Sequence, residues 1–220
     1  MCRFLLAKAR KPINPTPLLS DFAKMAKKSK AYDGDWQGDG WGCAWWNGRK
    51  WEQYLSLKPV WEDEDFFRYI PNTELFIIHA RSASFEKHKN RIRFNQPFIK
   101  GKYVFVFNGL LKGVTLPYSL SGQIGSEKIW SLLQKYLEKY PTKEAFKKTV
   151  KELNKYAKYI QALNIGLSDG KNIYAYTQFA KHEEYYHLRH SHSKDVDIVC
   201  SEVMKGYEFE KMILKTVVNW

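Results

Sequence analysis

The sequence predicts a layered α+β domain in which antiparallel sheets are covered by helices. Three observations lead to this prediction: strand-like runs dominate the early and late parts of the chain, two amphipathic helices lie between them, and no repeat, low-complexity tract or linker interrupts that order. With 220 residues, 44% hydrophobic and 16% aromatic, the chain can bury one sizeable core. We therefore expect residues 1–220 to form a single domain.

The strand predictions start near the N-terminus. Residues 2–9 contain a short apolar run that ends before a proline-rich segment, as strands often do. The Asn47-Gly48 pair, between aromatic-rich runs at 41–46 and 50–57, predicts a hairpin. Further strands are predicted at 74–79, 102–107, 163–167, 172–177, 184–189, 196–200 and 211–218.

Helical periodicity is clearest in the middle of the chain. Apolar residues recur at helical spacing over 126–139 and over 143–159, and Pro141 separates the two predicted helices. A shorter helix is predicted over 18–29, and the polar, glycine-rich segment 32–42 that follows it is predicted to be a loop.

The net charge and the aromatic content limit the kinds of binding partner that we expect. A net charge of +13 favours polyanions or an acidic partner protein, but many of the lysines lie on the polar face of the 143–158 segment. A solvated helix face explains that pattern, so a nucleic-acid partner is not expected. The eight tryptophans are likewise expected to pack a core or line a pocket rather than stack on bases.

The cysteine pattern and the hydropathy indicate the cellular compartment that we expect for this protein. Cys2, Cys43 and Cys200 form no Cys-x-x-Cys pair, so neither a disulfide framework nor a zinc knuckle is indicated, and a reducing compartment fits best. No segment approaches the roughly 20 apolar residues of a membrane span. We expect a cytoplasmic protein without a membrane partner.

Three histidines cluster late in the chain. His190 and His192 would share one face of a strand, as metal ligands often do, and His187 lies close by. The sequence shows no neighbouring cysteine or acid that completes a site, so no metal is expected.

Cys2 is the most informative position for chemistry. Removal of the initiator Met before a small side chain would leave Cys2 with a free α-amine. Because such an amine titrates near ~7.7–8.0, it can accept the thiol proton, so that one residue supplies nucleophile and base. A cysteine at position two is more often incidental, and the hypothesis therefore needs support elsewhere.

Two segments that follow apolar strands offer that support. Arg81 can clamp a carboxylate with two parallel hydrogen bonds, and Ser84 can add a hydroxyl, although a surface arginine is the alternative. The Asn108 amide and the Gly109 backbone N–H can together hold an oxyanion. An ordinary Asn-Gly turn is the alternative there.

A third segment opens the predicted helix at 126–139. Gly125 and Ser126 lie where free backbone N–H groups and a polar cap can border a ligand pocket. Taken alone, the segment is more typical of a plain helix cap.

In this order the segments resemble the class II glutamine amidotransferases, a branch of the Ntn hydrolases, and especially their small stand-alone forms. The marks are the Met-Cys-Arg-Phe start, residues 79–84 in place of the family's His-x-Arg-Trp/Tyr-Ala-Thr/Ser, Asn-Gln-Pro-Phe at 95–98, Phe-Asn-Gly at 107–109 for the family's His-Asn-Gly, and Ser-Glu at 201–202.

The resemblance implies a four-layer αββα sandwich of two mainly antiparallel sheets flanked by helices. It implies Cys2 as the nucleophile with its own amine as base, Arg81 and Ser84 as the carboxylate clamp, and Asn108 with Gly109 as the oxyanion hole. Such enzymes hydrolyse the side-chain amide of glutamine through a γ-glutamyl thioester and usually pass the ammonia to a synthase, here a separate subunit. The reaction uses only protein groups and water, so no cofactor is expected.

Gly125 is the most serious departure from the family pattern. It stands where the family's Ser/Thr-Asp-Ser/Thr-Glu motif places the Asp that holds the substrate's α-ammonium. Losing a charge-assisted hydrogen bond of ~1.5–3 kcal/mol would weaken glutamine binding roughly ten- to hundredfold, unless another acid replaces it. The candidates are Asp33, Asp35 and Asp39 in the glycine-rich loop. Two further changes, Phe85 and Phe107 for family histidines, alter pocket shape.

Two alternatives follow from these departures. The chain can be a hydrolase of γ-glutamyl peptides or conjugates, or an inactive basic binding protein on the same scaffold.

Overall fold

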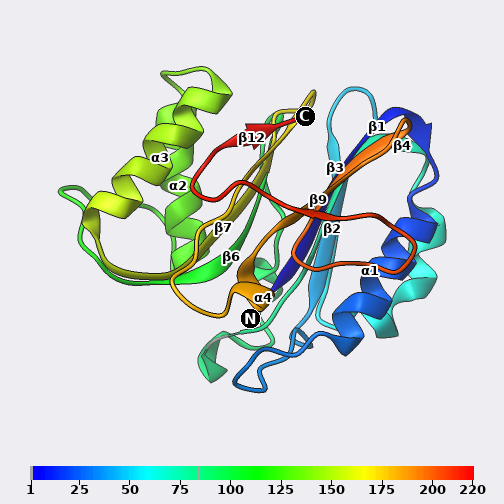
Figure 1. Ribbon diagram of the computed structural model, residues 1–220, viewed down its shortest axis with the longest axis horizontal. Coiled ribbons are helices and arrows are strands. Elements are labelled where there is room, and N and C mark those ends of the chain that lie inside the picture. The colour runs from blue at the N-terminus through cyan, green and yellow to red at the C-terminus, as the bar shows by residue number, and fades with distance from the viewer. Residues whose placement is uncertain (1, 84) are drawn as a thin grey trace.

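The computed structural model describes residues 2–83 and 85–220. Two antiparallel sheets lie face to face, with α1 on one outer side and α2 and α3 on the other (Figure 1). The first sheet has the strand order β11-β9-β10-β1-β4-β2-β3, and the second has the order β12-β8-β7-β6-β5.

The element bounds are as follows. The first sheet contains β1 (Arg3–Ile13), β2 (Trp41–Trp46), β3 (Trp51–Ser56), β4 (Thr73–Ala80), β9 (Arg189–His192), β10 (Val196–Cys200) and β11 (Glu210–Lys211). The second contains β5 (Phe98–Lys100), β6 (Tyr103–Val114), β7 (Ala157–Ser168), β8 (Ile173–Tyr176) and β12 (Val218–Asn219). The helices are α1 (Thr16–Lys28), α2 (Gly125–Leu137), α3 (Thr142–Tyr156) and α4 (Glu183–Tyr186).

Three apolar layers hold the sandwich together. Side chains of α1 such as Phe22 pack on the outer face of the first sheet, and those of α2 and α3 such as Leu133 and Phe146 pack on the outer face of the second. Between the sheets lie alternate residues of the facing strands, including Leu6 of β1 and Val106 of β6. The predicted four-layer αββα arrangement is confirmed.

Several predicted boundaries were wrong. The predicted strand at 184–189 is largely the short helix α4, whose Tyr185 and Tyr186 turn inward onto Ala162, and β9 begins only at Arg189. Of the predicted strand at 211–218, only Lys211 in β11 and Val218 in β12 are in strands, and these strands belong to different sheets. Hydrophobic periodicity does not reveal the α4 turn or the interval between β11 and β12, because a segment that crosses between layers also keeps apolar residues on its inner side.

The strand β6 excludes the hairpin-turn interpretation of Asn108-Gly109. It runs without interruption from Tyr103 to Val114, and Asn108 pairs with Asn164 of β7. The pair is therefore inside a strand and is not a hairpin turn.

No helix within the described residues is long and apolar enough to cross a membrane.

Candidate active site

The Cys2 side chain lies at the start of the central strand β1. The antiparallel register places Arg3 beside Ala80, so the residues that follow β4 meet the beginning of β1. The Cys2 Sγ accepts a hydrogen bond from the Ser82 N–H at 3.4 Å and lies 3.6 Å from the Ser82 carbonyl oxygen. Cys2 is half-buried, so the thiol is held by backbone groups yet remains accessible.

Arg3 fixes the strand end that carries Cys2. Its buried guanidinium donates to Ser29 Oγ at 2.7 Å and to the Tyr185 carbonyl at 2.7 Å, and it pairs with Glu202 at 2.9 Å. It also lies over the Tyr185 ring at 3.6 Å, a cation–π contact. The sequence motif contained Arg3, but this anchoring role was not predicted from it.

Arg81 is buried beside the thiol. Its guanidinium donates to the His88 carbonyl at 2.6 Å, to Asn95 Oδ1 at 3.1 Å and to the Asp39 carbonyl at 3.5 Å. Burial lowers the pKa of Arg81, whereas the nearby charges of Cys2 and Asp39 oppose that shift, and a guanidinium stays protonated regardless. These contacts orient a fixed positive charge within electrostatic reach of Cys2.

Asn108 presents a buried donor without a partner. The side chain is 2% exposed, and within the described residues its Nδ2 makes no hydrogen bond. Burying an amide N–H unpaired costs about 1–3 kcal/mol, so proteins rarely keep one unless a ligand uses it. Next to it, a Cβ on Gly109 would lie 2.2 Å from the Ala162 carbonyl oxygen, so only glycine fits.

His79 and Gln96 brace β6 against the first sheet. His79 Nε2 lies 3.3 Å from the Phe107 carbonyl oxygen, Gln96 Oε1 accepts from the Phe107 N–H at 2.6 Å, and Gln96 Nε2 donates back to the Phe107 carbonyl at 3.4 Å. Burial, with the charge of Arg81 as a smaller cause, lowers the pKa of His79 to about 3. The imidazole is therefore neutral, and we assign its proton to Nε2 because the facing group is an acceptor.

The glycine-rich loop brings two carboxylates to the same place. Asp35 Oδ2 accepts from Ser82 Oγ at 2.6 Å, and Asp39 Oδ2 accepts from the Ala83 N–H at 2.7 Å. Asp33, by contrast, is exposed and accepts from the N–H of Asp35 in its own loop. Two of the three acids that the sequence offered as replacements thus lie against the segment that contacts the thiol.

A cavity of about 510 Å³ opens beside this segment. Trp36 and Trp61, which stack on each other with ring centroids 4.6 Å apart, form part of its lining. Its other lining residues are Gly34, Asp35, Gly38, Asp39, Pro59, Glu62, Ala83, Glu86 and Lys89. The cavity therefore adjoins the site through Asp35, Asp39 and Ala83, while Cys2, Arg81 and Asn108 are outside its lining.

Gly125 and Ser126 form the first turn of α2. No hydrogen bond joins Ser126 to Cys2, Arg81 or Asn108 in the part of the chain that the structure describes. A Cβ added at Gly125 would meet no atom within 4 Å, so the position is open. Ser84, the remaining predicted ligand, lies outside the described residues.

The αββα sandwich is the fold of the Ntn hydrolases, and the comparisons with known proteins agree. A sequence profile described as "Glutamine amidotransferases class-II" matches residues 1–208, and the chain belongs to this family. No curated protein sequence matches the chain.

Solved structures match over nearly the whole chain at low identity, which establishes the shared fold. A glutamine aminotransferase class-II domain protein from Silicibacter pomeroyi has a TM-score of 0.66 at 15% identity, covering 99% of this chain and 94% of that one. The glutamine phosphoribosylpyrophosphate amidotransferase from B. subtilis has a TM-score of 0.69 at 12% identity, covering 100% of this chain and 49% of that one. A predicted glutamine amidotransferase from Pseudomonas aeruginosa PA01 has a TM-score of 0.56 at 15% identity, with coverages of 100% and 96%.

Proposed function

We propose that this protein hydrolyses the γ-amide of glutamine through a thioester on Cys2. The observation that carries the proposal is the unpartnered, buried Asn108 amide, together with a half-buried thiol and a buried arginine at the meeting point of β1, β4 and β6. A strand that keeps a buried donor unpaired is typical of a site that stabilises developing negative charge.

In the proposed reaction the Cys2 amine, free once Met1 is removed, takes the thiol proton. The sulfur then attacks the γ-carbonyl carbon, and the resulting oxyanion accepts hydrogen bonds from Asn108 Nδ2 and the Gly109 N–H. The tetrahedral intermediate then collapses and its C–N bond breaks. The protonated Cys2 amine donates its proton to the leaving nitrogen, which departs as ammonia. Water then hydrolyses the thioester by the same route in reverse order, giving glutamate and the free thiol.

The two ends of the amino acid need opposite charges. We assign the substrate carboxylate to Arg81 and Ser84, because Arg81 is fixed by three acceptors and carries a permanent charge. The α-ammonium is assigned to Asp35 and Asp39, since both carboxylates lie against residues 82 and 83. Gly125 and Ser126 would border the pocket only through the first turn of α2.

A γ-glutamyl conjugate is the second candidate substrate. The cavity of about 510 Å³ adjoins the site and is lined by Trp36 and Trp61 together with carboxylates, so it offers room for an amine larger than ammonia. Stacked indoles and acids favour a cationic or apolar leaving group. For glutamine itself, we propose that the released ammonia serves a separate synthase.

The cytoplasm is the proposed compartment, because Cys2, Cys43 and Cys200 are all free thiols.

Parallel measurements of ammonia release from glutamine and of amine release from γ-glutamyl peptides test the proposal and separate the two substrates. Cys2→Ala should abolish both activities, whereas Cys43→Ala, which removes a buried thiol of β2, should retain them. Turnover by Cys2→Ala at the wild-type rate would show that the proposal is wrong.

A further inference from the structure

A second cluster of chemically capable side chains lies on the edge strands β9 and β10. His190 and His192 occupy alternate positions of β9, and Asp197 of β10 is the register partner of His192. His192 Nδ1 lies 2.5 Å from Asp197 Oδ1, and His190 Nε2 lies 3.6 Å from the same oxygen. Each residue offers one ligand atom, and the three atoms lie within 4.8 Å of one another.

The carboxylate at the centre of this cluster is held in place. Asp197 is 3% exposed, and its Oδ2 pairs with Arg10 Nη1 at 2.6 Å, which leaves Oδ1 facing the imidazoles. The His190 ring stacks on Trp220 with centroids 4.3 Å apart. Metal-binding carboxylates and histidines are commonly oriented by such outer contacts.

The His190 imidazole has an unused nitrogen. Its Nε2 is buried and makes no hydrogen bond to the described residues, since 3.6 Å to Asp197 Oδ1 is too long. Buried ring nitrogens are normally satisfied by a partner. A cation between His190 and Asp197 would supply one.

We propose that His190, His192 and Asp197 bind a divalent transition-metal ion, with Zn²⁺ as the reference ion. Two imidazoles and one carboxylate are a typical set of protein ligands for zinc, and a water molecule can take the fourth position because the His192 side chain is 65% exposed. An ion that prefers oxygen ligands alone, such as Mg²⁺, is not expected to bind.

The two nitrogen distances to Asp197 Oδ1 require only a small adjustment, and the two imidazole nitrogens lie within 4.8 Å of each other. Zinc bonds of about 2.0–2.2 Å in a tetrahedron separate the ligand atoms by about 3.3 Å. The 3.6 Å between His190 and Asp197 already fits, whereas the 2.5 Å between His192 and Asp197 must lengthen by less than an ångström. His192 can make that movement because it is exposed.

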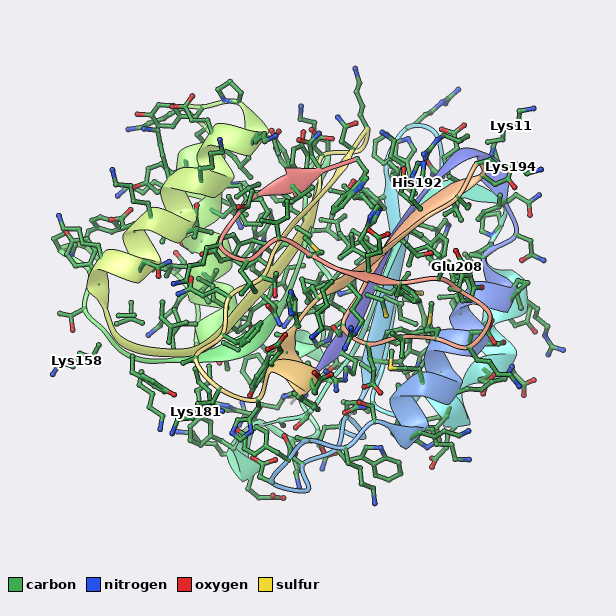
Figure 2. All side chains as sticks on the ribbon, viewed as in Figure 1. Lys11, Lys158, Lys181, His192, Lys194 and Glu208 are labelled. Atoms are coloured by element: carbon green, nitrogen blue, oxygen red, sulfur yellow. The ribbon has the colours of Figure 1, made fainter. Side chains whose placement is uncertain are left out.

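The proposed site is separate from the Cys2 centre. Asp197 pairs with Lys8 of β1, six positions along the strand from Cys2 (8 − 2 = 6), or about 20 Å at about 3.3 Å per residue. Figure 2 places His192 in the upper half of the molecule, on the same side as Lys11 and Lys194, whereas the chain starts in the lower half in Figure 1. Metal binding here would therefore tie β9 to β10 rather than enter the proposed amide chemistry.

Titration calorimetry of the full chain with ZnCl₂ tests the proposal. A Cys2→Ala background removes the accessible thiol as a competing ligand. Because the measured quantity is the heat of metal binding, the result does not depend on the proposed amidohydrolase activity. We expect one Zn²⁺ per chain, no heat with Mg²⁺, and a visible absorption band typical of four-coordinate Co²⁺ when cobalt replaces zinc.

Two substitutions decide the assignment. His192→Ala removes an exposed ligand and should weaken Zn²⁺ binding by more than about tenfold, since even the loss of an outer partner costs about 10–100-fold. His182→Asn is the matched control, because it removes an exposed histidine outside the cluster and asparagine tolerates the left-handed backbone there, φ 59°. Absence of Zn²⁺ binding, or equal affinity in His192→Ala and His182→Asn, would overturn the proposal.

Discussion

Alanine variants of Asn108 and Asn164 should distinguish a residue that serves catalysis from one that serves stability. They are register partners on β6 and β7 and are both buried, but their side chains differ in hydrogen bonding. Asn108 Nδ2 has no partner among the described residues, whereas Asn164 Nδ2 donates to the Tyr186 carbonyl at 2.6 Å and Asn164 Oδ1 accepts from Thr177 at 2.9 Å. Replacing each by alanine should therefore have opposite consequences.

The magnitudes follow from these contacts. Asn108→Ala breaks no hydrogen bond of Nδ2, so we expect the free energy of unfolding to change by less than about 1 kcal/mol, because a lost desolvation cost offsets lost packing. Removing an oxyanion donor lowers kcat by about 10²–10³, or about 2.7–4 kcal/mol. Asn164→Ala removes the two buried hydrogen bonds that Asn164 makes to Tyr186 and Thr177 and should lower the free energy of unfolding by about 2 kcal/mol or more.

Urea unfolding and steady-state ammonia release, measured on both variants, provide the assay. Asn108→Ala should be stable and nearly inactive, and Asn164→Ala should be destabilised while its folded fraction keeps turnover. If Asn108→Ala keeps kcat within about threefold of wild type, or loses as much stability as Asn164→Ala, the oxyanion assignment is refuted.

Three further predictions concern the substrate and the buried histidine. Asp39→Asn removes a carboxylate assigned to the α-ammonium and should raise KM for glutamine about tenfold, whereas Asp33→Asn, which changes an exposed acid of the same loop, should leave KM unchanged; an unchanged KM in Asp39→Asn would contradict the assignment. Trp61→Ala should raise KM for γ-glutamyl peptides severalfold and leave KM for glutamine unchanged, and equal effects on both would remove the cavity from substrate binding. The pKa of His79 is lowered to about 3, so the unfolded chain binds the extra proton and stability present above pH ~6.5 is lost as the pH falls. Between pH 6 and 4 the wild type should lose about 1.4 kcal/mol per pH unit more than His79→Gln in chemical denaturation, and parallel curves would show that His79 does not stay neutral.

Local patterns predicted most of the fold because they report burial on one face. The apolar stripe over 126–139 marked the face of α2 that packs on the second sheet, and the aromatic runs around Asn47-Gly48 formed the β2–β3 hairpin. The ends of elements were less certain: α3 gives way directly to β7 at Ala157, where no proline or glycine marks the change.

Contacts between segments that are distant in the chain could not be predicted from the sequence. Asp197 completes the cluster of His190 and His192 only through the β9–β10 register, so the sequence offered no acid to accompany the histidines. His79 and Gln96 brace Phe107 across the two sheets, a role that residue type alone does not reveal. Such positions depend on how layers stack, which local periodicity does not encode.

The central claim is that Cys2 is the reactive nucleophile at a processed N-terminus. Intact-mass spectrometry of the native chain, after treatment with a thiol-alkylating analogue of glutamine, tests it most directly. Burial raises the pKa of Cys43 and raises that of Cys200 to about 12, so neither thiol should react. The account predicts a chain that lacks Met1 and carries one label on Cys2. A retained Met1, or a label on Cys43 or Cys200 instead, would contradict it.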